Sequence, residues 1–107
     1  MAVLESTIAA SGTNGSAVNV SVPQEPIFAI ETPAALTSTA LTFQYSPDGG
    51  TTWKQVFKEG TGYSLTVAAN RMIVVDPVVF RGLPLVRPVA GSAEAAARVI
   101  RFHTGLA

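Results

Sequence analysis

The stretch LTFQYSPDGGTTW, residues 41–53, predicts a β-hairpin and with it the fold class of the chain. Apolar and polar residues alternate over residues 41–45, which places a leucine, a phenylalanine and a tyrosine on one face of an extended strand. Asp48 and the two glycines after it interrupt this alternation, because aspartate side chains close turns and glycine accepts positive φ at little cost. Trp53 then begins a second strand, since large aromatic residues favour β structure.

On both sides of this hairpin the chain consists of short β-rich runs separated by Gly, Pro, Asn and Asp. The connections are too short for crossover helices, so the strands are expected to be antiparallel. About eight or nine short strands with little helix predict an all-β antiparallel sandwich of jelly-roll or Greek-key type. The predicted strands are residues 3–8, 17–22, 27–31, 40–46, 52–57, 63–67, 71–76, 84–91 and 97–104.

Four local features add detail to this prediction. The nearly continuous apolar run 71–76 is typical of a strand buried on both faces. Pro88 interrupts its strand and indicates an edge or a bulge, since proline cannot donate to a central ladder. Either a helical turn capped by Thr32 or a loop precedes residue 40. Asp76 caps one short helical turn that ends at Gly82.

The 107 residues fit a single sandwich domain, residues 1–107. Residues 1–16 are apolar and then rich in Gly, Ser and Thr, and we consider them as an N-terminal arm that reaches a neighbouring molecule. Charged residues make up only 13% of the chain, about half of the usual share of roughly 25%. A surface with so little charge predicts contact with another protein.

The charge pattern and composition argue against several classes of partner and site. Seven basic and seven acidic residues leave no net charge, so neither a nucleic-acid footprint nor a basic membrane-binding run is expected. The chain has no cysteine, which excludes disulfides and thiolate metal sites. The first fifteen residues lack the basic and long apolar regions of a signal peptide, and no apolar run approaches the length of a membrane span.

Residues 46–53, SPDGGTTW, also match S-x-D-x-G-x-T-W, the Asp-box of sialidase-like propellers. In those proteins the motif is structural, and a propeller needs several four-stranded blades, more than this chain holds. We therefore interpret the stretch as a hairpin, with glycan or ligand contact as the alternative. No glycine-rich stretch matches a phosphate-binding pattern, so no cofactor is expected.

The titratable residues predict no catalytic or metal site. His103 is the only histidine, and a surface or packing role is favoured over a metal ligand or a member of a Ser-His-Asp triad. The carboxylates are scattered, so a catalytic pair is not expected. Asp48 and Asp76 have turn roles, whereas Glu25 and Glu31 lie on segments flanked by prolines, where solvent or interface exposure is plausible.

Two further sets of residues are open to a structural or a binding interpretation. Alternating aromatics on adjacent strands usually form a core face, with a sugar-stacking platform as the alternative. This set is Phe43, Tyr45, Trp53, Phe57 and Tyr63. The arginines all follow residue 70 and are either plain surface charge or interface residues. They are Arg71, Arg81, Arg87, Arg98 and Arg101.

Taken together, three motifs resemble a family of small β-sandwich proteins encoded beside the capsid genes of tailed bacteriophages. They are the hairpin L-T-F-Q-x-S-x-D-G-G-x-x-W at residues 41–53, the strand ending in Asp76-Pro77, and the Ala/Gly/Ser-rich loop before the R-x-I strand of residues 98–100. Tyr45 occupies the first variable position of the hairpin motif. The resemblance covers residues 36–102.

The resemblance implies a capsid decoration or cement protein, made in the host bacterial cytoplasm and bound as a homotrimer to the outside of the virion. Its implied partner is the major capsid protein, and it implies no enzyme and no catalytic residue. The alternatives are a neck, tail or fibre component of the phage, or a carbohydrate-binding β-sandwich module.

Overall fold

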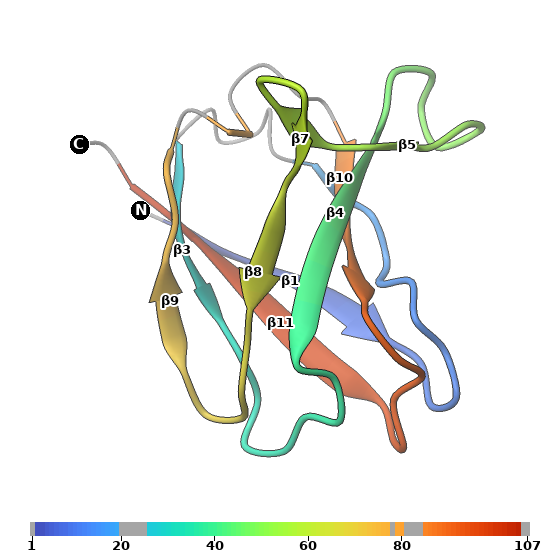
Figure 1. The fold of residues 1–107 in the computed structure, drawn as a ribbon, viewed down its shortest axis with the longest axis vertical. Coiled ribbons are helices and arrows are strands. Elements are labelled where there is room, and N and C mark those ends of the chain that lie inside the picture. The colour runs from blue at the N-terminus through green and yellow to red at the C-terminus, as the bar shows by residue number, and fades with distance from the viewer. Residues whose placement is uncertain (1, 20–25, 78, 81–84, 106–107) are drawn as a thin grey trace.

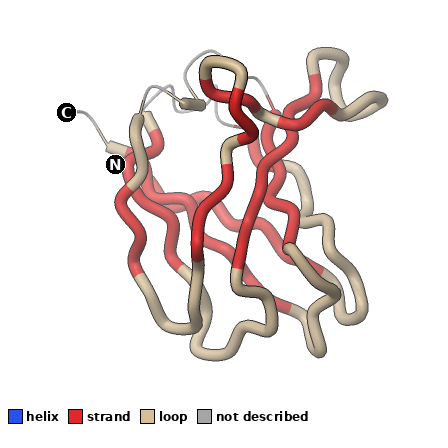
Figure 2. Tube along the Cα trace, viewed as in Figure 1, coloured by secondary structure: helices blue, strands red, loops and turns tan. Residues whose placement is uncertain are grey.

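The structure, a computed structural model, describes residues 2–19, 26–77, 79–80 and 85–105. These residues form strands joined by turns and loops, with no helix among them (Figures 1 and 2). The strands are β1 (Ala2–Ile8), β2 (Val18–Asn19), β3 (Ile27–Glu31), β4 (Ala40–Ser46), β5 (Lys54–Gln55), β6 (Phe57–Lys58), β7 (Thr61–Gly62), β8 (Ser64–Thr66), β9 (Met72–Val74), β10 (Leu85–Ala90) and β11 (Arg98–Thr104).

The strands form an antiparallel sandwich with the strand order of a jelly roll. One sheet runs β1-β11-β3-β9, and the other runs β2-β10-β4, with β5 and β8 both paired to β4. In this arrangement β1 pairs with β11, β2 with β10, β3 with β9 and β4 with β8, as in one long hairpin that has been rolled up. Figure 1 shows β1 and β11 lying behind β4 and β8. The structure thus confirms the all-β sandwich and selects the jelly roll.

The core lies between the two sheets and is built from the alternating residues of their inner faces. Inward positions of β4, β10 and β11 are buried while their neighbours are partly exposed, as the two-residue period of a strand requires. An aromatic cluster forms its centre, in which Phe43 packs edge-on against Phe80 and Phe102 with ring centroids 5.2 and 6.1 Å apart. Tyr63 packs against the same cluster.

The prediction of one continuous strand over residues 52–57 is wrong. The segment divides into β5 and β6 at Val56, whose N–H donates to the Phe43 carbonyl. Val56 is buried, whereas Phe57, expected on the packed face, is 58% exposed. The division turns the chain out of the sheet and into the separate β6–β7 hairpin, where Glu59 and Gly60 adopt positive φ in a tight turn.

The expectation that residues 71–76 are buried on both faces is also wrong. Its central part, β9, is an end strand of its sheet among the described residues. Ile73 and Val75 face the core, but Met72 and Val74 are 55% and 80% exposed. The apolar run therefore has one buried face, because nothing described covers the other.

Pro88 was expected on an edge or at a bulge, but β10 lies between β2 and β4. On the β2 side, however, β10 is paired with β2 only at Leu85 and Val86, so no regular strand lies beside Pro88 there. There the Gly15 N–H donates to the Pro88 carbonyl instead. Gly15 is buried, and a Cβ at this position would lie 2.7 Å from the Pro88 ring, so glycine is required by the close approach.

Residues 2–16, which we considered as an arm, lie within the sandwich in this structure. All seven residues of β1 pair with β11, and Ile8 is fully buried. Residues 33–39 form a loop, so the second of the two alternatives after Thr32 holds. A turn follows Asp76, with the Val79 N–H donating to its carbonyl, while Gly82 lies outside the described residues.

Candidate functional site

The outer face of the four-stranded sheet gathers charged and apolar side chains in two cross-strand rows. Pairing aligns Glu5, Arg101, Glu31 and Met72 in one row, and Val3, His103, Ala29 and Val74 in the next. Side chains on one face alternate along each strand and lie opposite one another across strands. We call the set Val3, Glu5, Glu31, Met72, Val74, Arg101 and His103 the outer face.

The charged groups of the outer face are paired with each other. Arg101 Nε donates to Glu5 Oε2 at 2.9 Å, with both side chains substantially exposed. His103 Nε2 lies 2.8 Å from Glu31 Oε1. Each of these side chains therefore has a partner within the sheet, and His103 lies partly buried at its surface.

Apolar exposure is concentrated on this same face. Four large hydrophobic side chains among the described residues are exposed, and three of them, Val3, Met72 and Val74, belong to the outer face. Val3 is 48% exposed. Beside it, an open groove between β1 and β2 is lined by residues 3–5 and 17–19. A face with paired charges and exposed valine and methionine side chains is suited to protein contact.

The hairpin of residues 46–53 is held by its own side chains, as predicted. Ser46 Oγ accepts from the Gly50 N–H at 2.7 Å. Asp48 accepts from the Thr52 N–H at 2.9 Å and from the Thr52 hydroxyl at 2.7 Å. These donors, the Thr52 backbone N–H foremost, lower the pKa of Asp48 to about 2. The carboxylate oxygens are thus occupied by turn donors, which supports a structural role for the motif.

Trp53 does not restart the strand. The guanidinium of Arg87 lies 4.2 Å from the centroid of its ring, and Arg87 Nε donates to Gln44 Oε1 at 2.8 Å. The arginine bridges the tryptophan to the outer side of β4, as a cation–π contact does. Of the five aromatics, Phe43 is buried and Tyr45 and Tyr63 pack against the core, whereas Trp53 and Phe57 do not join it. The predicted core face is therefore only partly formed.

The other described arginines also contact their own chain. Arg71 Nη1 donates to the carbonyls of Ala69 and Asn70, and Arg98 forms an ion pair with Glu94. Arg81 and Glu25 lie outside the described residues. Asp76, expected in a turn, also forms an exposed ion pair with Lys58 at 2.9 Å.

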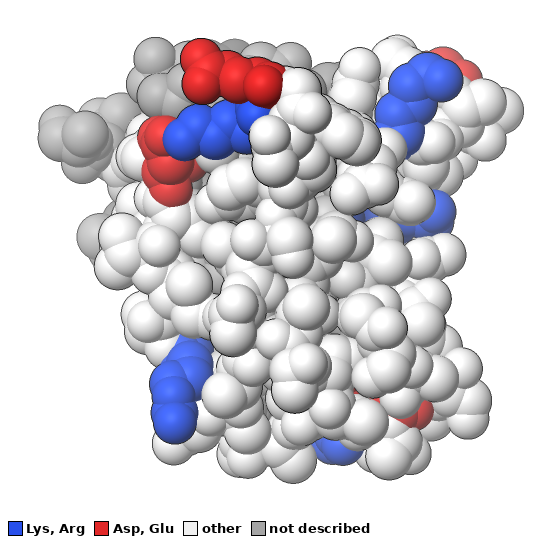
Figure 3. All heavy atoms as spheres, viewed as in Figure 1, with Lys and Arg blue, Asp and Glu red and all other residues white. Residues whose placement is uncertain are grey.

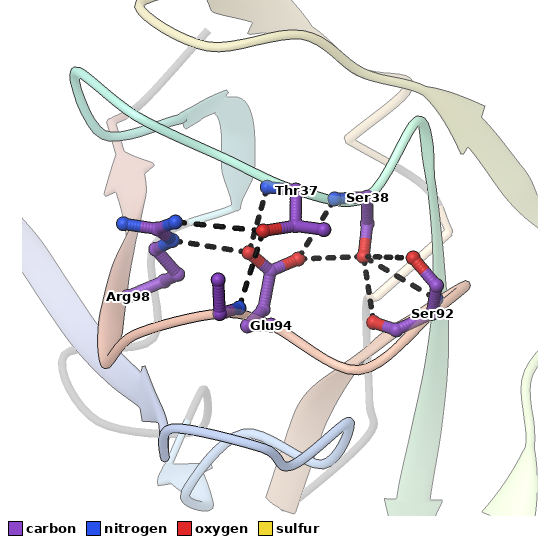
Figure 4. Close-up of polar contacts among 6 residues, drawn as sticks. Thr37, Ser38, Ser92, Glu94 and Arg98 are labelled. Carbon is purple, nitrogen blue, oxygen red and sulfur yellow. Dashed lines mark hydrogen bonds and ion pairs between the residues drawn. The ribbon is translucent and has the colours of Figure 1, made fainter.

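Glu94 is a charged residue that sequence reasoning missed, since its segment was identified only as an Ala/Gly/Ser-rich loop. Figure 4 shows its carboxylate pointing toward Thr37 and Ser38 of the β3–β4 loop and toward Arg98. Four donors surround it: the Thr37 and Ser38 N–H groups at 2.8 and 2.9 Å, the Ser38 hydroxyl at 2.6 Å and Arg98 Nε at 3.0 Å. The residue is 1% exposed.

Desolvation raises the pKa of Glu94, but the four donors together outweigh it and lower the pKa to about 2. A carboxylate held in this state is fully ionised at neutral pH and has no free lone pair directed at a substrate. Its backbone is also engaged, with the Glu94 N–H donating to Gly12 and its carbonyl accepting from Ser11. Glu94 therefore joins three loops at one end of the sandwich. One feature of the sequence could have identified Glu94, since it is the sole charged residue between Arg87 and Arg98.

Within the described residues, no group of three His, Asp or Glu side chains is placed to hold a metal ion. The same residues contain no helix long and apolar enough to cross a membrane. No protein-family model, curated protein or solved structure matches the chain.

Proposed function

We propose that this chain is a structural virion protein that decorates the outside of a phage head and stabilises contacts between major capsid protein subunits. The observation that carries the proposal is the outer face, on which exposed apolar side chains of the two end strands, β1 and β9, lie beside side chains that are paired with each other. Burying such a face against a protein surface costs less desolvation free energy than burying unpaired charges would, because its charged groups already have partners.

Two further features support the proposal. The jelly-roll order is used by viral capsid and lectin domains, which is support by analogy of fold alone. The surface also carries little charge: in Figure 3 the charged atoms lie toward the rim of the view and the area over β4 and β8 is uncharged. Low charge reduces repulsion between copies crowded on a particle.

The proposal is tested by adding the purified protein to expanded capsid shells that lack it and measuring bound copies and shell stability to heat. Val3→Lys places a charge on the outer face at an exposed position and is expected to weaken binding at least tenfold. Ser64→Lys is the matched control, since Ser64 is exposed on β8 of the other sheet. Equal binding of both variants contradicts the assignment of the outer face.

Copy number separates the proposal from its alternative, a neck, tail or fibre component. In purified particles a decoration protein is present at a ratio near one to the major capsid protein, whereas a neck or tail part is present at a few copies per hundred. Association as a homotrimer on the capsid is part of the proposal, and electron microscopy of the decorated shells measures how the bound copies are grouped. Binding to glycans but not to shells overturns the proposal in favour of a carbohydrate-binding module.

A further inference from the structure

Strand β9 presents backbone groups along one side that no described strand pairs with. The Thr32 N–H donates to the Arg71 carbonyl, and the Val75 N–H donates to the Phe28 carbonyl. These bonds direct the odd-numbered residues of the segment toward β3, so the N–H and C=O groups of Met72 and Val74 point to the open side. Among the described residues no strand lies beyond β9 in its sheet.

Within the described residues, this edge lacks the devices that usually prevent strands from pairing. Soluble proteins protect edges with lysine, proline, bulges or a covering segment. β9 has the sequence Met-Ile-Val and regular pairing to β3. Met72 and Val74 are among the most exposed large apolar side chains of the described structure, so the edge combines free hydrogen-bonding groups with apolar side chains.

We propose that β9 is a self-pairing edge, at which a second copy of this chain adds its own β9 antiparallel about a two-fold axis. Backbone alternation requires that the outward-pointing, even-numbered residues of the two copies face each other. Among the registers that satisfy this, the one in which Met72 faces Val74 of the second copy, with Ile73 on the axis, lets both outward-pointing residues of β9 exchange N–H···O bonds within the strand. The same register brings each Met72 side chain beside the partner's Val74, which buries the exposed apolar pair.

Charge at the two ends of β9 favours this antiparallel arrangement. Arg71 precedes the strand, and Asp76 follows it with Lys58 and Glu59 nearby, so one end is positive and the other is net negative. Figure 3 shows basic atoms near the turn between β8 and β9 and mostly acidic atoms near the far end of β9. Antiparallel pairing sets opposite ends together, whereas parallel pairing would set like charges side by side.

The contact is short, so it belongs to the class of small interfaces below about 1,200 Å² that associate weakly. It is an isologous contact, in which the same patch is used on both copies. It differs from the three-fold association implied by the family resemblance, and it does not depend on capsid binding. Capsid binding by a protein that stays monomeric in solution would overturn this inference and leave the proposed function intact.

The mass of the protein in solution is the first test. Sedimentation equilibrium is measured from tens of micromolar to about 1 mM, where weak complexes become populated. The weight-average mass is expected to rise toward twice the monomer mass. Val74→Lys should abolish this rise without loss of fold, because Val74 is 80% exposed. Thr66→Lys, which adds the same charge on exposed β8 of the other sheet, should associate like the natural chain.

Cysteine pairs test the register. Hydrogen-bonded antiparallel neighbours have Cα atoms about 5.5 Å apart, within the range of a disulfide. The chain has no cysteine of its own, so the double variant M72C/V74C should form covalent dimers under mild oxidation, while M72C or V74C alone should not. Monomers at all concentrations, a trimer, dimers that survive V74K, or crosslinking by either single variant would each overturn the proposal.

Discussion

Replacing Glu94 by glutamine removes one charge from the most enclosed polar network of the structure while keeping the size of the side chain. Both carboxylate oxygens accept two hydrogen bonds, Oε1 from Thr37 N and Arg98 Nε, and Oε2 from the N–H and hydroxyl of Ser38. In either orientation the amide –NH₂ of glutamine faces two of these donors. The variant therefore loses acceptors in a site 1% exposed, where an unsatisfied polar group is costly.

The expected loss in the free energy of unfolding follows from the pKa of Glu94. Folding lowers it from 4.5 to about 2, and each unit corresponds to about 1.4 kcal/mol, so the ionised carboxylate contributes about 3 kcal/mol to the free energy of unfolding. In other proteins, removing one partner of a buried ion pair lowers the free energy of unfolding by a similar amount, roughly 3–5 kcal/mol. For a domain of this size we expect Tm to fall by roughly 10–20 °C.

The pH dependence has a definite sign. Because the folded-state pKa is lowered, the contribution is fully present above pH 4.5 and is lost as the pH falls toward about 2. The difference in the free energy of unfolding between the natural chain and E94Q should therefore be large at pH 7 and shrink at low pH. Urea unfolding followed by tryptophan fluorescence and circular dichroism at several pH values measures both quantities.

The matched control is Glu5→Gln, which removes the same charge from the exposed pair with Arg101. Exposed pairs contribute about 0–1 kcal/mol, so this variant should unfold close to the natural chain. Equal unfolding midpoints for E94Q and E5Q would refute this role of Glu94. A loss of stability in E94Q that does not change with pH would show that packing, and not charge, holds the three loops together.

Two other substitutions and one deletion test further features of the same structure. Asp48→Ala should lower Tm because two Thr52 donors lose their acceptor, and this effect should diminish as the pH falls below 3.8 toward 2; an unchanged Tm at pH 7 would mean that Asp48 does not hold the turn. Gly15→Ala should destabilise the fold by about 1–3 kcal/mol through overpacking against Pro88, measured by urea unfolding. Deleting residues 2–8 should abolish cooperative thermal unfolding, since this segment pairs with β11, whereas a detachable arm would leave the transition intact.

Turns and strand positions were predictable because they depend on neighbours within a few residues. The hairpin of residues 46–53 closes through Ser46 and Asp48, the side chains assigned to it from the sequence. Alternation in residues 40–46 likewise identified the inward face of β4. The outer face was not predictable, since its rows join residues as distant as Glu5 and Arg101.

The sequence by itself determined the antiparallel β class, the turns and most strand positions, because each follows from local periodicity and backbone preference. Only the tertiary structure decided which apolar residues are covered. The run 71–76 has the composition of a central strand, yet the rolled strand order places β9 at the end of a sheet and leaves Val74 exposed. Conversely, Glu94 is a charged residue in a loop, where exposure to solvent is the usual expectation. The fold instead surrounds its carboxylate with donors from a segment more than fifty residues away. Burial depends on which segments meet in space, and that order is set by the packing of both sheets together.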